Sequence, residues 1–133
     1  MNVVDSSGWL EVLTESGNSA FFEQPLKRKS QLVVPTICVF EVCRKINRLR
    51  GKQAAIKTAA WMKRHGTIVE LTFELSLSAV SLADEHNLPM ADSIIYATAK
   101  MYDATLWTQD SDFAGLEGVK YKAKPRVKRK QKK

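Results

Sequence analysis

The sequence has 133 residues and a mass of 15.0 kDa, with 44% apolar and 26% charged residues. A chain of this length can bury one hydrophobic core, so we expect one folded domain that needs neither disulfides nor a structural metal. The longest apolar runs have four residues, far below the roughly 18 or more that a membrane-spanning helix needs. The first residues lack the features of a signal peptide, and we therefore expect a cytoplasmic protein.

The net charge of +7 is unevenly distributed along the chain. Nine of the 21 basic residues and no acidic residue lie between Lys120 and Lys133, which leaves a net charge of −2 in positions 1–119. Blocks of like charge with few apolar residues are typical of disordered tails. We expect a folded domain over residues 1–122 and a basic, disordered tail over residues 123–133.

Apolar runs bounded by turn residues predict five strands, separated by helices. The expected strands cover residues 3–5, 32–34, 67–71, 105–108 and 119–121. The expected helices run from 6–8 to Gly17, over 20–29, 36–50, 52–65 and 75–87, and from 89–92 to 101. Helical connections of this length imply parallel pairing through right-handed crossovers. The predicted fold class is α/β, a three-layer α/β/α sandwich with a central, mainly parallel sheet.

The two cysteines, Cys38 and Cys43, lie five residues apart within an expected helix. Their side chains should therefore point in different directions, and the spacing suits neither a disulfide nor a zinc site. We expect both to be free thiols, with burial in the core the usual placement of such residues.

Acidic residues occupy the places where an open parallel sheet binds ligands, just after a strand or early in a helix. They are Asp5, Glu41, Asp92 and Asp110, with Asp112 two residues further on. Each also has a structural interpretation. Asp5 and Asp92 suit helix caps, Glu41 has Lys45 four residues on as an ion-pair partner, and Asp110 or Asp112 suits an Asx turn.

The fold can bring these carboxylates to one edge of the sheet, where they would repel one another unless a cation neutralised them. Mg²⁺ or Mn²⁺ fits this set, because hard divalent ions prefer oxygen ligands and Mg²⁺ completes its shell with water and substrate phosphate. Such an ion polarises a phosphoryl oxygen and activates water. The reaction class that this predicts is phosphodiester hydrolysis.

Four segments carry a family resemblance when they are taken together. They are Val3-Val4-Asp5-Ser6-Ser7, Pro35-Thr36 to Phe40-Glu41-Val42, Leu88-Pro89-Met90-Ala91-Asp92-Ser93, and Leu106-Trp107-Thr108-Gln109-Asp110-Ser111-Asp112-Phe113. In order and spacing, over about residues 2–122, they resemble the PIN-domain ribonucleases, specifically the small VapC-type toxins of bacterial and archaeal toxin–antitoxin pairs.

The resemblance implies a metal-dependent endoribonuclease that hydrolyses RNA with a metal-activated water and without a covalent intermediate. It implies that the catalytic and metal-binding residues are Asp5, Glu41, Asp92 and Asp110, supported by Ser7, Thr108 and Asp112. Asp110 and Asp112 compete for the fourth role, and Asp110 is preferred because it directly follows Thr108-Gln109. The implied cofactor is Mg²⁺ or Mn²⁺, and the implied partners are RNA, a cognate antitoxin and a second copy of the chain in a homodimer.

Two surfaces have alternative interpretations. The basic tail, which the family pattern lacks, would bind the RNA backbone without reading sequence, or it is merely a solvated terminus. Its expected RNA-binding residues are Lys124, Arg126, Lys128, Arg129 and Lys130. On the helical hairpin, Trp61 and Met62 either cover the core or, in a toxin, receive an amphipathic segment of the antitoxin.

Two rival functions remain open at this point. One is a PIN-type RNA-processing nuclease without an antitoxin, which would not arrest growth when expressed. The other is a non-catalytic basic RNA-binding module, whose carboxylates are caps and ion-pair partners and whose RNA binding survives chelation of metals.

Overall fold

A computed structural model describes residues 1–125 of the chain. Its strands are β1 (Asn2–Val4), β2 (Val33–Pro35), β3 (Thr67–Val69), β4 (Thr105–Thr108) and β5 (Val119–Tyr121). Its α-helices are α1 (Ser6–Leu13), α2 (Ser19–Leu26), α3 (Thr36–Arg50), α4 (Lys52–His65), α5 (Phe73–His86) and α6 (Met90–Met101). Two short 3₁₀ turns are η1 (Lys29–Gln31) and η2 (Ser111–Phe113). None of the helices within these residues is long and apolar enough to cross a membrane.

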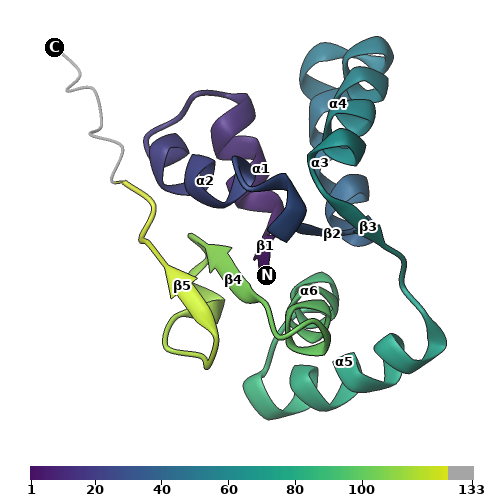
Figure 1. Ribbon diagram of the computed structural model, residues 1–133, viewed down its shortest axis with the longest axis vertical. Coiled ribbons are helices and arrows are strands. Elements are labelled where there is room, and N and C mark those ends of the chain that lie inside the picture. Colours follow the sequence, from purple (N-terminus) through teal and green to yellow (C-terminus); the bar gives the residue numbers. More distant parts are fainter. Residues whose placement is uncertain (126–133) are drawn as a thin grey trace, which may run out of the picture.

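Strands β1, β4 and β5 pair in parallel in the order β1-β4-β5, and β2 pairs in parallel with β3. A single bridge between Asn2 and Leu32 joins the β2–β3 pair to the β1–β4–β5 sheet. The α1–α2 and α3–α4 pairs lie on one side of the strands and the α5–α6 pair on the other (Figure 1). The predicted three-layer α/β/α sandwich with a parallel sheet is therefore confirmed. Because all strands are parallel, their carboxyl ends share one edge, where a ligand site is expected.

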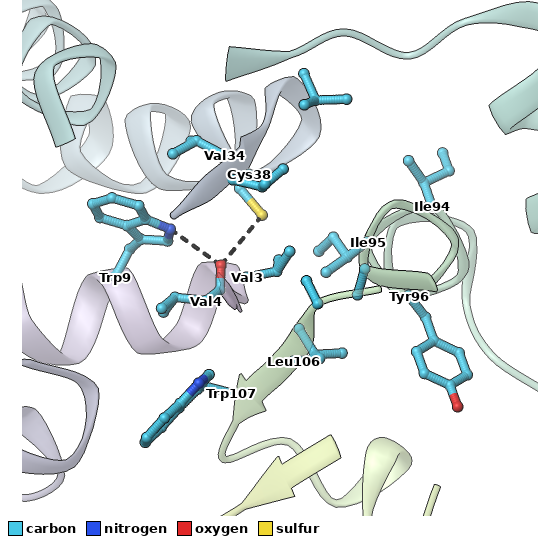
Figure 2. Packing of buried hydrophobic residues seen from close by; sticks show 14 of the residues in the cluster. Val3, Val4, Trp9, Val34, Cys38, Ile94, Ile95, Tyr96, Leu106 and Trp107 are labelled. Atoms are coloured by element: carbon cyan, nitrogen blue, oxygen red, sulfur yellow. Dashed lines mark hydrogen bonds between the residues drawn. The ribbon is translucent and has the colours of Figure 1, made fainter. Parts of the chain in front are cut away.

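Strand β1 lies at the centre of the core, and both Val3 and Val4 are fully buried. The carbonyl of Val4 accepts hydrogen bonds from Trp9 Nε1 at 3.1 Å and from Cys38 Sγ at 3.8 Å (Figure 2). These contacts tie α1 and α3 to the central strand. Both cysteines are free thiols, as the spacing predicted; Cys38 is buried, as expected, whereas Cys43 is only half-buried.

The hairpin of α3 and α4 uses its large apolar side chains mainly for the core. Met62 is fully buried. Trp61 is half-buried, and its ring meets that of Trp9 edge-on at a centroid distance of 5.4 Å. These contacts support the core interpretation of Trp61 and Met62. The side chain of Phe40, by contrast, is 61% exposed on α3.

Some predicted boundaries differ from the structure because local contacts end an element early. The first helix ends at Leu13 rather than at Gly17, because Glu15 has a φ of 51° and breaks the helical backbone. The second helix ends at Leu26 rather than at residue 29. Strand β3 ends at Val69 rather than at residue 71, since its partner β2 ends at the residue opposite. The remainder of the expected basic tail, residues 126–133, lies outside the described residues.

Candidate metal and catalytic site

Asp5 follows β1 directly and caps the N-terminus of α1, as its structural interpretation predicted. Its Oδ1 accepts hydrogen bonds from the backbone N–H of Gly8 at 2.9 Å and from the hydroxyl of Ser7 at 2.8 Å. Its Oδ2 accepts a hydrogen bond from the hydroxyl of Thr108 at 2.6 Å. The side chain is 4% exposed. Three donors therefore hold a nearly buried carboxylate in one orientation at the carboxyl edge of the sheet.

Thr108 ends β4, the strand next to β1, and links Asp5 to the acidic residues that follow β4. Its hydroxyl oxygen accepts the backbone N–H of Asp110 at 2.9 Å. Asp110 in turn accepts the backbone N–H of Asp112 at 2.9 Å, which is the predicted Asx turn. The turn fixes the direction of Asp110 and does not exclude a role for it in the site.

Asp92 lies in the first turn of α6 and is half-buried. The interpretation of Asp92 as a simple cap is wrong, because Pro89 occupies the N-cap position and no side chain caps the helix. Within residues 1–125, no hydrogen bond holds the Asp92 carboxylate. A half-buried carboxylate without a donor is costly to ionise and is available to a ligand.

Asp92, Asp110 and Asp112 form the closest group of carboxylates within the described residues. Each offers one oxygen, and these oxygens lie within 4.8 Å of one another. Asp92 and Asp110 are half-buried, whereas Asp112 is exposed. Asp110 and Asp112, the two candidates for the fourth acidic residue, therefore both lie beside Asp92.

Glu41 lies on α3 and is half-buried. Its Oε1 accepts a hydrogen bond from the hydroxyl of Ser6 at 2.5 Å. The expected alternative partner, Lys45, forms no ion pair with Glu41; the ion pairs within residues 1–125 join other residues. Glu41 is therefore held toward the start of α1, where Asp5 also lies.

The charges of the other four acidic residues all act on the Asp92 carboxylate. Burial, followed by the charges of the other four acidic residues, raises the pKa of Asp92 to about 7. Burial likewise raises the pKa of Asp5 to about 6, although its hydrogen bonds from Thr108, Gly8 and Ser7 oppose the shift. Carboxylates with pKa values raised in this way suit a divalent cation, because its charge removes their repulsion and hard ions prefer oxygen ligands. The residues present therefore fit such an ion.

The structure brings the predicted acidic residues together and adds a residue that the sequence reasoning missed. Ser7 and Thr108, the expected supporting residues, each donate a hydrogen bond to Asp5. Ser6, which was not singled out, is the residue that holds Glu41. The local sequence does not indicate that the adjacent residues Ser6 and Ser7 donate to different acidic residues. Of the expected RNA-binding residues, Lys124 is exposed, while Arg126, Lys128, Arg129 and Lys130 lie outside the described residues.

Residues 3–119 match the family model of the PIN domain. The chain belongs to the PIN-domain family. The match spans all five acidic residues and every described helix and strand except the first residue of β1 and the last two of β5. A search of curated proteins finds no match to the chain.

Solved structures similar to this PIN-domain chain include a toxin–antitoxin complex and a toxin. A toxin–antitoxin complex from Klebsiella pneumoniae is 25% identical, with a TM-score of 0.73 over 90% of this chain and 95% of that one. The Mycobacterium tuberculosis toxin VapC20, which cleaves the sarcin-ricin loop, is 18% identical, with a TM-score of 0.71 over 86% and 93%. Rickettsia felis VapBC2, bound to a DNA fragment from its promoter, is 13% identical, with a TM-score of 0.70 over 92% and 97%. VapC20 and VapBC2 are less than 25% identical to this chain, so their similarity shows a shared fold only. The resemblance to PIN-domain proteins is confirmed by the family model.

Proposed function

We propose that this PIN-domain protein is a metal-dependent endoribonuclease and the toxin of a toxin–antitoxin pair. The observation that carries the proposal is the convergence of five carboxylates at one sheet edge, three of them with oxygens within 4.8 Å of one another. Family membership and the toxin structures that resemble the chain support the same activity.

Asp5, Glu41, Asp92 and Asp110 would hold one or two Mg²⁺ or Mn²⁺ ions, with Asp112 beside them. A bound ion would polarise the phosphoryl group and the attacking water. The chain's own contribution is to position the ligands: Ser7 and Thr108 orient Asp5, and Ser6 orients Glu41. Because Asp92 lacks a donor, its carboxylate is the member of the set that a cation would stabilise most.

Cleavage of total cellular RNA by the purified protein tests the activity. We expect cleavage with Mn²⁺ or Mg²⁺, none with a chelator, and loss of cleavage in Asp92→Asn. Asp103→Asn is a matched control, because Asp103 is exposed at the opposite end of β4 and its φ of 49° suits asparagine. RNA binding without any cleavage, after removal of a co-purified antitoxin, would favour the binding module instead.

The proposed antitoxin would present an apolar segment to the groove between α3, α4 and β3. This groove has a volume of about 600 Å³ and is lined mainly by apolar residues, with Phe40 exposed beside Glu41. Similar complexes with an antitoxin, including VapBC from Salmonella typhimurium and FitAcB from Neisseria gonorrhoeae, support a protein partner. Phe40→Ser should weaken copurification with the antitoxin without changing the melting temperature.

We extend the proposal to a homodimer, supported by apolar side chains on α5. Phe73, Leu77 and Val80 follow one helix face and are each more than half exposed. Light scattering tests the dimer, and Leu77→Glu should shift the mass to that of a monomer. Growth arrest on expression, relieved by the antitoxin, separates a toxin from an RNA-processing nuclease.

A further inference from the structure

The chain leaves the sheet beside the acidic site. Strand β5 pairs with β4 so that Tyr121 lies opposite Thr108, and the backbone N–H of Lys122 donates to the Thr108 carbonyl at 3.0 Å. The side chain of the same threonine holds Asp5. Residues 122–125 then pass the turn between α1 and α2 (Figure 1). This C-terminal strip, defined as residues 120–125, therefore begins within one residue of the site.

A buried asparagine ties the strip to the site. Asn18 is 1% exposed, and its Nδ2 donates both to Gln109 Oε1 at 3.0 Å and to the carbonyl of Ala123 at 3.1 Å. Its backbone N–H donates to Glu11 Oε2 at 2.9 Å. Asn18 thus joins α1, the loop that leads to Asp110, and the C-terminal strip. These contacts take no part in holding the proposed metal ligands.

A close contact at Gly17 also fixes the path of the strip. A Cβ atom on Gly17 would lie 2.7 Å from Cγ of Pro125, too near for either residue to keep its place. Gly17 has no positive φ, so its backbone alone does not demand glycine. The missing side chain therefore leaves space for the strip.

The strip carries lysines at the alternate positions 120, 122 and 124. Lys120 Nζ lies 4.4 Å from the ring centroid of Trp107, and Lys122 Nζ lies 5.8 Å from that of Phe21. Lys124 is exposed, and no ion pair within residues 1–125 involves these lysines. The sequence after Pro125 adds six Lys or Arg residues and no acid.

The acidic site creates an electrostatic problem for a phosphate chain, because five carboxylates repel it wherever no cation lies between them. Lysines carried beside the site would offset this repulsion and hold the RNA backbone in one direction. We propose that the C-terminal strip is a phosphate-binding track for RNA, and that Asn18 and Gly17 are positioning residues that hold it beside the site. This inference rests on the proposed ribonuclease activity for the identity of the nucleic acid.

The test measures binding of a fluorescent single-stranded RNA in EDTA, by anisotropy, across a range of salt concentrations. The Lys122→Gln and Lys124→Gln variants should each make the slope of log K against log salt shallower by about 0.7, the value for one phosphate contact on a single strand. Lys57→Gln is the matched control, since Lys57 is exposed on α4, and should leave the slope unchanged. An unchanged slope in both strip variants overturns the proposal.

The positioning role has its own readout. Gly17→Ala should displace the strip and raise the Kd for RNA several-fold, while Asp5 and its donors keep their places. Adding Pro125→Ala removes the clashing Cγ and should restore the Kd. In the Lys122→Gln, Lys124→Gln background, Gly17→Ala should have no further effect; an equal effect there would mean a general disturbance and overturn the positioning role.

Two further outcomes distinguish this proposal from a protein-docking surface and from the proposed nuclease function. If the strip variants spare RNA binding and instead weaken binding of polyglutamate, the strip is a docking surface for an acidic protein, and the RNA track is wrong. Because binding is measured without cleavage, a protein that never cuts RNA but shows the expected slopes retains the track and loses the nuclease function. RNA cleavage by the wild type, together with unchanged salt slopes in the strip variants, would support the nuclease function and overturn the RNA track.

Discussion

The hydroxyl of Thr108 donates a hydrogen bond of 2.6 Å to Oδ2 of Asp5, 103 residues away in the chain. The same oxygen accepts the backbone N–H of Asp110 at 2.9 Å. Thr108 is fully buried, so water does not compete for either bond. One side chain therefore fixes two of the proposed metal ligands, which follow adjacent strands, relative to each other.

Thr108→Val tests this arrangement with a side chain of similar shape that has no hydroxyl. Asp5 loses one of three donors and the Asp110 N–H loses its acceptor. Since partners of metal ligands typically contribute about 10–100-fold to metal affinity or activity, we expect a loss of that size in metal-dependent RNA cleavage. Thr108→Ser should retain most activity. An unchanged metal requirement in a folded valine variant would show that Thr108 is only a core residue.

Ser6 and Ser7 should contribute unequally, although they are adjacent and identical. Ser6 is the side chain that donates to Glu41, whereas Ser7 is one of three donors to Asp5. We therefore expect Ser6→Ala to lower kcat/KM for RNA cleavage more than Ser7→Ala does. Steady-state kinetics on one RNA substrate make the comparison, and a larger loss in Ser7→Ala would contradict it.

The metal-free protein should become less stable as the pH rises from about 4 to about 7. The pKa of Asp5 is raised from 3.8 to about 6 and that of Asp92 to about 7, so the folded state binds more protons than the unfolded state over this range. For Asp5 alone the loss approaches about 3 kcal/mol once both states are ionised. Urea unfolding in EDTA should give a lower midpoint at pH 8 than at pH 5. The difference should shrink in Asp5→Asn, and a higher midpoint at pH 8 would refute the shifts.

Asp92→Asn should separate loss of activity from loss of folding. The substitution removes a carboxylate that four other charges repel, so at pH 8 we expect the metal-free variant to melt at a higher temperature than the wild type. It should also lose much of the rise in melting temperature that Mn²⁺ gives the wild type through binding to the folded state. Asp103→Asn should melt like the wild type in both conditions. Equal Mn²⁺ stabilisation of Asp92→Asn and wild type would exclude Asp92 as a ligand.

The sequence by itself determined the order and type of the elements and the positions of the acidic residues. Helices α3 and α4 were predicted to the residue, because the apolar repeat and the glycines at 51 and 66 are local signals. The alternation of strands and helices determined the parallel sheet, and a parallel sheet brings Asp5 and Asp110 to one edge. Boundaries set by a partner strand, such as the end of β3 at Val69, had no local signal.

Only the tertiary structure decided which side chains meet. Successive helical residues point about 100° apart, so the packing of α1 against α3 decided that Ser6 rather than Ser7 reaches Glu41. The path of the chain after β4 placed both Asp110 and Asp112 beside Asp92. The contact of Asn18 with Ala123 spans 105 residues. Such contacts depend on the relative positions of packed segments to within an ångström, which no local pattern of residues specifies.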